Sequence, residues 1–265
     1  INQISIDLKK IVVENSSDKT IETDLSKLNN NIKLIFSQNN GYASAINLAR
    51  TKVTTKYFFV LNPDIQKISD KLISIFCQSA KELKDNFGAL GPRFENVNEK
   101  SHKQSNINEK YGKIESISGA AMFFCTEIFD KNGGFDENFF LYFEETDYCN
   151  RSNKNNFKVY QINSQKVCHD TGTSVETFSE EESYKLKKLF RWHFIWSKFY
   201  FYKKKYGKLI SLMIFTPQFL RLIFRISLYT LNSNKEMREK YLIRYNGLMT
   251  SVKGKKSSIR INDFS

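Results

Sequence analysis

The chain has 265 residues, enough for one sizeable core, and its 40% apolar and 14% aromatic content with only 3 Pro excludes a disordered, collagen-like or proline-rich protein. The formal net charge of +13 is unevenly placed, because residues 1–180 carry 22 Lys and Arg against 23 Asp and Glu, whereas residues 181–265 carry 19 against 5. This confined excess predicts a C-terminal surface that meets something anionic, such as phospholipid headgroups.

Apolar runs of strand length alternate with segments of helical spacing in the first part of the chain. The runs are Lys10–Val13, Ile32–Phe36, Tyr57–Leu61 and Phe87–Leu90, and two short strands are expected later at Val159–Ile162 and Lys166–Cys168. This alternation predicts an α/β domain with a Rossmann-like, mostly parallel sheet flanked by helices. From Ser179 the pattern is helical to about Met249. We therefore expect an α/β domain over residues 1–178 and a basic, amphipathic helical region over residues 179–265.

The four cysteines are widely spaced and form no CxxC pair: Cys77, Cys125, Cys149 and Cys168. This spacing argues against a zinc ribbon and against a disulfide scaffold in a chain of this length. We expect reduced thiols in a cytosolic protein.

Asn62, Pro63 and Asp64 follow the apolar run Tyr57–Leu61. Ligands of open α/β sheets bind beyond the carboxyl ends of the strands, so Asn62 is a candidate ligand-binding residue and Asp64 a candidate ligand of a divalent metal on a diphosphate. Pro63 keeps the residue before it extended up to the acid. The alternative is an ordinary turn, since all three are turn residues.

Glu144, Glu145 and Asp147 place three carboxylates within four residues, directly after an aromatic and apolar run. A carboxylate in partly apolar surroundings has a pKa raised toward that of a general base for a hydroxyl proton. On a helix Glu144 and Asp147 share a face and Glu145 points elsewhere. The alternative is an acidic first turn that favours the helix dipole.

His169 ends the last apolar run of the sheet region. A neutral imidazole there could complete a metal site with Asp64, although a purely structural histidine is the alternative.

Two strand-to-helix turns supply candidates for binding a nucleotide. Their residues are Glu14, Asn15, Ser17, Asn40, Gly41 and Asn47. Asn and Ser side chains can contact a base and a ribose, and Gly41 lets the backbone approach a ligand closely. Helix caps of the same composition are common.

The order of these segments resembles that of the family 2 glycosyltransferases. The segments are Val12–Ser17, Asn40–Asn47, Leu61–Asp64 and Leu90–Pro92. The later segments resemble the rhamnosyltransferase-like branch of that family, namely Ser118–Ala120, Gly133–Glu137, Phe140–Asp147 and His169 with Gly172 and Ser174. The resemblance covers roughly residues 8–205.

The resemblance implies a GT-A fold and an inverting hexosyl transfer from a nucleotide diphosphate sugar, with a dTDP- or UDP-sugar as the expected donor. It implies Mg²⁺ or Mn²⁺ at Asp64, with His169 as a further metal or diphosphate ligand, and Glu145 as the base. Gly119, Ala120, Glu144 and Asp147 are expected to contact the acceptor or to support the site. The first strand of the family, which helps to hold the base, is not present before Ile1, so we expect weak donor binding.

The C-terminal region is expected to attach peripherally to the inner face of the cytoplasmic membrane, where a polyprenyl-diphosphate-linked saccharide would be the acceptor. Leu209–Leu231 is apolar but contains Pro217, Arg221 and Arg225, which favours an interfacial helix over a spanning one. Trp192 and Trp196 are expected as membrane anchors. The alternative is that these helices pack on the α/β domain or form a dimer.

Two other functional classes compete with an enzyme. A catalytically silent or truncated relative would bind only glycan or membrane. A nucleic-acid binder would use the basic region, but the near-neutral first 180 residues and the lack of a recognised nucleic-acid motif argue against it.

Overall fold

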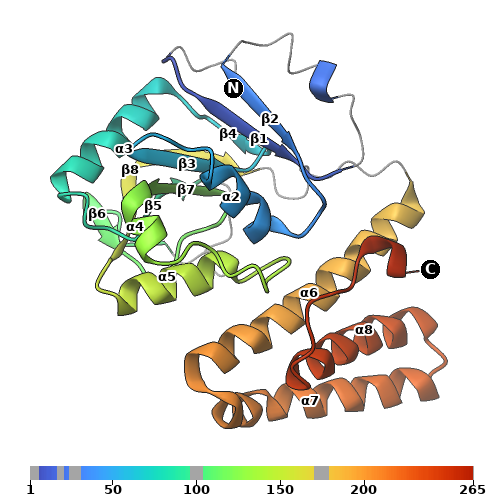
Figure 1. Cartoon of the computed structure of the whole chain (residues 1–265). Coiled ribbons are helices and arrows are strands. Elements are labelled where there is room, and N and C mark those ends of the chain that lie inside the picture. The colour runs from blue at the N-terminus through green and yellow to red at the C-terminus, as the bar shows by residue number, and fades with distance from the viewer. Residues whose placement is uncertain (1–5, 17–20, 24–30, 96–103, 170–178, 265) are drawn as a thin grey trace. The chain divides into compact units, whose positions relative to one another are not determined.

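The computed structural model describes residues 6–16, 21–23, 31–95, 104–169 and 179–264 (Figure 1). The chain divides into two compact units, which we call the α/β unit (Ile1–Asp136 and Glu144–Val175) and the helical unit (Glu137–Phe143 and Glu176–Ser265). The short segment Glu137–Phe143 therefore groups with the helices, although the α/β unit continues directly after it.

The α/β unit alternates strands and helices in the expected way. Its described elements are β1 (Lys10–Glu14), β2 (Ile32–Phe36), α2 (Tyr42–Arg50), β3 (Tyr57–Leu61), β4 (Ile65–Gln66), α3 (Asp70–Glu82), β5 (Ala89–Phe94), β6 (Tyr111–Lys113), β7 (Ala121–Cys125), α4 (Thr126–Lys131), α5 (Glu144–Lys154) and β8 (Val159–His169). The two short strands expected near residue 160 are one strand, β8. Its polar middle residues Gln161 and Asn163 interrupt the apolar pattern, yet both are buried.

The sheet is mixed, which corrects the expectation of a mostly parallel one. β1 pairs with β2 and β5 pairs with β8 in parallel, whereas β7 runs antiparallel to β3 and β5, and β4 and β6 run antiparallel to β8. The order in the main sheet is β3-β7-β5-β8-β4, with β6 beside β8. Apolar runs reveal where strands lie but not in which direction they pair.

Alternation along β7 divides the core into two layers. Ala121, Phe123 and Cys125 point to the side of α3, where Phe76 packs, and Met122 and Phe124 point to the side of α2. α3 forms because Leu72, Phe76 and Ala80 make one buried stripe and the Ser69 hydroxyl caps its first turn, accepting from the Leu72 N–H at 3.2 Å. The sheet thus has helices on both faces, as predicted.

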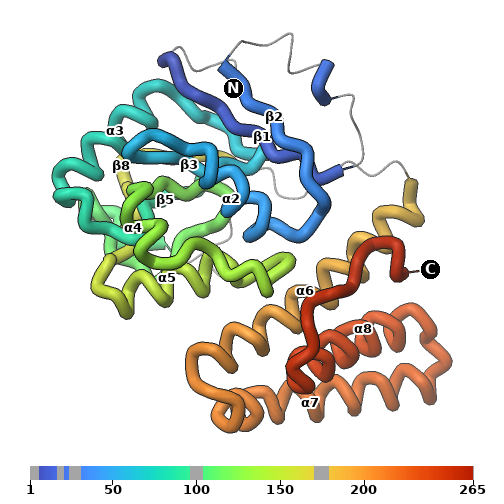
Figure 2. Tube along the Cα trace, in the orientation of Figure 1, coloured from blue at the N-terminus to red at the C-terminus, as the bar shows by residue number. Residues whose placement is uncertain are grey.

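The helical unit contains α6 (Glu180–Tyr206), α7 (Lys208–Leu231), α8 (Lys235–Val252) and the 3₁₀ turn η1 (Ile261–Asp263), and its three long helices lie side by side (Figure 2). Gly207, with φ of 84°, separates α6 from α7. Trp192 and Trp196 are each 2% exposed, and their indole N–H groups donate to Asn246 Oδ1 and to the Lys255 carbonyl. The expectation that they are membrane anchors is therefore wrong.

The segment Glu137–Phe143 is held against α6 by aromatic contacts. The ring of Phe140 lies 4.6 Å from that of His193, and the Ser197 hydroxyl donates to the Leu141 carbonyl at 2.8 Å. Tyr142 and Phe143 have left-handed backbone conformations, with φ of 69° and 70°. Such conformations are strained for aromatic residues and persist only where packing holds them.

Candidate functional site

The two predicted metal ligands meet at one edge of the sheet. β4 pairs with the end of β8, with Ile65 opposite His169, and this register brings the preceding residue Asp64 beside the histidine. His169 Nε2 lies 3.2 Å from Asp64 Oδ1, and the side chains are only 13% and 2% exposed. Asn62 begins the turn that carries the acid, because its carbonyl accepts from the Ile65 N–H at 3.2 Å.

This pair suits a divalent cation. A carboxylate oxygen and an imidazole nitrogen are both metal-binding groups, and the carboxylate is the kind of ligand that Mg²⁺ and Mn²⁺ prefer. Among the described residues no cluster of three or more His, Cys, Asp and Glu side chains could hold an ion. Asp64 and His169 could contribute two side-chain ligands to such an ion.

Tyr42 connects the metal pair to the acidic helix. Its hydroxyl donates to the Gly119 carbonyl at 2.5 Å, and the pKa of Tyr42 is raised well above its usual value by burial and by the nearby charges of Glu144, Glu145 and Asp64. These three acids thus surround one phenol. The Asn62 N–H donates to the Ala120 carbonyl at 2.9 Å, so the Asp64 turn and the Gly119-Ala120 segment are also joined directly.

Gly119 lies next to both Tyr42 and Glu145. A Cβ at this position would lie 3.6 Å from Tyr42 Cε1 and 3.7 Å from Glu145 Cγ, in ordinary van der Waals contact with both. A methyl group would therefore fit at position 119, beside the Tyr42 ring and the aliphatic part of Glu145.

Glu144 and Glu145 start α5, and both carboxyls have raised pKa values. Burial raises the pKa of Glu145, while the Thr146 hydroxyl donates to Glu145 Oε1 at 2.9 Å and favours the charged form. Burial and the neighbouring carboxylate of Glu145 raise the pKa of Glu144 well above its usual value. Because the two carboxyls interact, they lose their protons in two separate steps that belong to the pair, and between these steps the pair carries one negative charge.

The predicted nucleotide-binding turns lie at one edge of the β1–β2 pair. Parallel pairing sets Glu14 opposite Phe36, and the Ser37 N–H donates to the Glu14 carbonyl at 2.9 Å. Glu14 Oε1 accepts from the Ser16 N–H at 2.5 Å. Asn15 is partly buried next to Glu14 and Asn40 is exposed, while Ser17 lies outside the described residues.

Gly41 ends this edge and starts α2. Its φ of 99° is left-handed, and the next residue is Tyr42. The edge of the β1–β2 pair is thus linked through Gly41 and Tyr42 to Gly119 and the acidic helix.

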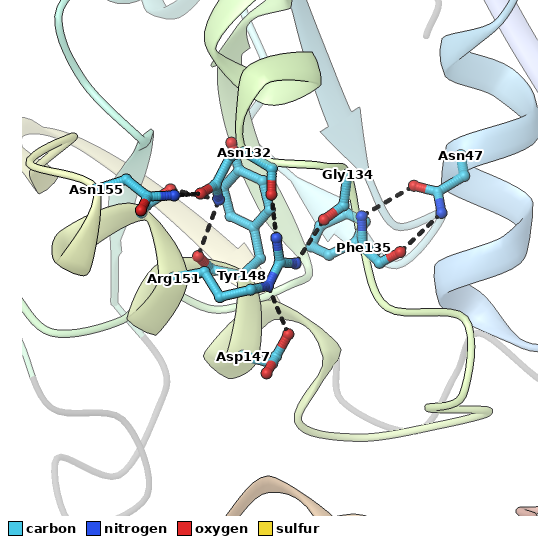
Figure 3. Close-up of polar contacts among 9 residues, drawn as sticks. Asn47, Asn132, Gly134, Phe135, Asp147, Tyr148, Arg151 and Asn155 are labelled. Atoms are coloured by element: carbon cyan, nitrogen blue, oxygen red, sulfur yellow. Dashed lines mark hydrogen bonds and ion pairs between the residues drawn. The ribbon is translucent and has the colours of Figure 1, made fainter. Parts of the chain in front are cut away.

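Asn47 and Asp147 serve the fold in this structure (Figure 3). Both polar ends of the Asn47 amide bind the Phe135 backbone, at 2.9 Å and 3.0 Å. The buried Asp147 carboxylate accepts from Arg151 Nε at 2.8 Å, and the same guanidinium donates to the carbonyls of Asn132 and Gly134. The Asn47 amide thus fixes the turn before Phe135, and the donor contact expected of Asn47 stays a prediction.

Sequence reasoning did not single out Tyr42 and Arg151. Tyr42 stood inside the segment Asn40–Asn47, but only its distant partner Gly119, 77 residues further on, gives the hydroxyl a role. Arg151 had a readable signal, since it follows Asp147 at the i,i+4 spacing of a helical ion pair.

Comparison with known proteins finds relatives by sequence and by structure. No known protein-family model matches the chain. Agl10 of Haloferax volcanii, a hexosyltransferase of low-salt glycan biosynthesis, is 24% identical over 216 residues, which are 73% of this chain and 68% of Agl10.

Several solved structures share this fold. The mannosyltransferase PcManGT of Pyrobaculum calidifontis, in complex with GDP-Man and Mn²⁺, matches 93% of this chain and 78% of its own at a TM-score of 0.58 and 11% identity. TarS 1–349 of S. aureus in complex with UDP matches 96% of this chain and 84% of its own, at a TM-score of 0.51 and 12% identity. The chain has a GT-A-like glycosyltransferase fold.

Coverage differs between relatives. GalNAc-T7 with UDP, GalNAc and Mn²⁺ matches 74% of this chain at a TM-score of 0.50 and 11% identity, and this chain spans only 44% of it. The rhamnosyltransferase-like branch stays a prediction.

Proposed function

We propose that this chain is a metal-dependent, inverting glycosyltransferase that moves a hexose from a nucleotide diphosphate to a hydroxyl of a saccharide acceptor. The observation that carries this proposal is the arrangement around Tyr42, where the Asp64–His169 pair and the Glu144–Glu145 pair lie close enough for all three acids to raise one phenol's pKa. A carboxylate and imidazole pair suits the diphosphate end of a donor, and an ionised carboxylate in buried surroundings suits the acceptor end.

Glu145 is the proposed general base. Its carboxylate takes the proton of the acceptor hydroxyl as that oxygen bonds to the anomeric carbon, and the bond from this carbon to the diphosphate oxygen breaks with its electron pair leaving on the diphosphate. This single displacement inverts the anomeric centre and forms no covalent sugar intermediate on the protein. In the proposed assignment Glu144 holds the proton that the pair retains, and Glu145 carries the single negative charge of the pair.

Asp64 and His169 would hold Mg²⁺ or Mn²⁺, which supplies neutralisation of the charge on the departing diphosphate. The edge formed by Glu14, Asn15 and Gly41 would contact the nucleotide, together with Asn40 from the adjoining turn.

The relatives support the donor and acceptor classes that we propose. Their structures hold UDP or GDP-Man, and Agl10 is named a hexosyltransferase of glycan biosynthesis, which supports a nucleotide-sugar donor and a glycan acceptor. Within this class we propose a dTDP- or UDP-sugar, with rhamnose as the first sugar to test, and a polyprenyl-diphosphate-linked acceptor at the cytoplasmic face of the membrane. All four cysteines are described and free, in keeping with a cytosolic location.

The test is release of nucleoside diphosphate from dTDP-rhamnose, UDP-hexoses and GDP-mannose, with Mn²⁺ and a lipid-linked saccharide acceptor. Glu145→Gln is expected to lower turnover by about 10²–10⁴-fold, the usual contribution of a general base. Glu127→Gln is the matched control, because Glu127 is an exposed acid of α4 with a side chain 72% exposed. Full turnover by Glu145→Gln would refute the assignment of the base.

A catalytically silent relative is the competing class. It would bind glycan or membrane without donor, so it predicts no metal-dependent nucleotide binding at the Asp64–His169 pair.

A further inference from the structure

One face of α7 is apolar and exposed. We call it the outer stripe, and its residues are Leu209, Met213, Leu220, Phe224 and Leu231. Their spacings of four and seven residues place them in line on one side of a helix. Each is more than half exposed, from 59% at Leu220 to 83% at Leu231. A row of large apolar side chains of this extent marks an interaction surface.

The opposite face of α7 is already used. Ser211, Phe215 and Leu222 repeat the same spacings and are buried. Phe215 and Leu222 form a core with residues of the other two long helices, namely Ile195, Phe199 and Leu248. α7 is therefore packed on α6 and α8 along its inner side, and the outer stripe takes no part in this core.

Three hydroxyl groups of α7 are hydrogen-bonded within the helix itself. The hydroxyls of Ser211, Thr216 and Thr230 each donate to the carbonyl four residues earlier, at 2.7–2.8 Å. They are satisfied within the helix and add little cost when the outer face leaves water.

Length and composition would allow α7 to cross a membrane, since it has 24 residues and a window of mean hydropathy 1.5. Its packing argues for lying in the interface instead. Crossing would carry Arg221 and Arg225 toward the bilayer centre and strip α7 from the polar helices that cover its inner side. An interfacial helix keeps those contacts and buries only one face.

Cations gather beside the start of α7. The cluster consists of Lys203, Lys204, Lys205, Lys208, Lys253, Lys255 and Lys256. The end of α6 meets the end of α8 here, because Lys203 Nζ lies 4.0 Å from where a Cβ on Gly254 would stand and Trp196 binds the Lys255 carbonyl. Residues 181–265 carry a net charge of +14, so this cluster lies in a strongly positive unit.

We propose that the helical unit docks on an anionic phospholipid surface, with the outer stripe of α7 seated at the boundary of headgroups and acyl chains and the lysine cluster on the headgroups. This proposal does not depend on the proposed transferase activity. A second copy of the chain is the less suitable occupant of the stripe, since it would bring together two copies of residues 181–265, each with a net charge of +14. Anionic lipid complements both the apolar and the cationic features.

The test is co-flotation of the full chain with vesicles of phosphatidylcholine alone or of phosphatidylcholine with phosphatidylglycerol. We expect binding to the anionic vesicles that weakens with salt. Met213→Gln with Phe224→Gln should reduce the partition coefficient more than about tenfold, because two large side chains no longer enter the apolar layer. Both residues are exposed, so circular dichroism should remain that of the parent protein.

Leu242→Gln is the matched control, because Leu242 is an exposed leucine of α8 outside the stripe, and it should bind as the parent does. Equal binding to neutral vesicles, no binding to either, or unchanged binding by the double variant would each overturn the proposal. A dimer in solution that the double variant dissociates, without vesicle binding, would assign the stripe to a second copy instead.

Discussion

Replacing Arg151 with Met is expected to destabilise the α/β unit strongly. The guanidinium joins α5, through Asp147, to the turn at Asn132 and Gly134, which Asn47 fixes from α2 (Figure 3). The variant keeps most of the side-chain volume and removes these charged hydrogen bonds together.

The magnitude follows from burial. The Asp147 side chain is 2% exposed, and removing one partner of a buried pair costs about 3–5 kcal/mol. Arg151 itself is 26% exposed, so water can replace part of what is lost, and we expect the lower end, about 3 kcal/mol.

The assay is urea unfolding, with amide hydrogen exchange in β5 and β7 to report on the α/β unit. Lys131→Met is the matched control, because Lys131 and Glu127 form an ion pair of the same i,i+4 spacing with side chains 58% and 72% exposed. It should cost no more than about 0.5 kcal/mol. A loss of unfolding free energy in Arg151→Met no larger than in this control would refute the reasoning. Adding Asp147→Asn to Arg151→Met should restore part of the stability.

Three further outcomes are expected. The transfer rate should rise with pH as Glu145 loses its proton, with an apparent pKa above the usual 4.3 or so. Glu144→Gln should leave this rise unchanged and should abolish any loss of rate at high pH that depends on ionisation of Glu144. A shift of the rise to another pH in Glu144→Gln would contradict the assigned roles. Tyr42→Phe should lower the rate about tenfold, as expected for loss of the bond to the Gly119 carbonyl, without loss of fold by circular dichroism. Burial lowers the pKa of His193 to about 4, so folding favours the neutral imidazole, and this contribution to stability is fully present above pH 6.5 or so. About 3 kcal/mol of the free energy of unfolding should be lost as the pH falls toward 4. His193→Gln should show a free energy of unfolding that depends less on pH.

The fold was largely readable from the sequence because apolar periodicity is a local property. The stripe of Leu72, Phe76 and Ala80 predicts α3, and the run Tyr57–Leu61 coincides with β3. Pairing direction was not readable, because it depends on β7, whose partners are distant in the chain. The buried amides of Gln161 and Asn163 hid the continuity of β8, since their partner Ser105 lies more than 50 residues away.

The sequence identified the acidic residues of the candidate site but not how the fold brings them together. Asp64 and His169 were both candidates, but the two-residue strand β4 that brings them together is too short to give a periodic signal. The raised pKa values of Glu144 and Glu145 depend on their burial and, for Glu144, on the neighbouring charge of Glu145, and burial is a property of the tertiary structure. The outer stripe of α7 follows a pattern visible in the sequence, yet only the packing shows which of the helix's two apolar faces is covered.

Metal-dependent nucleotide binding tests the central claim most directly. Calorimetric titration of the full chain with dTDP, UDP and GDP, with and without Mn²⁺, should show binding of one nucleotide that requires the metal and is lost in Asp64→Ala. Binding that does not change when Mn²⁺ is removed or Asp64 is replaced would contradict the assignment of this edge of the sheet as the donor site.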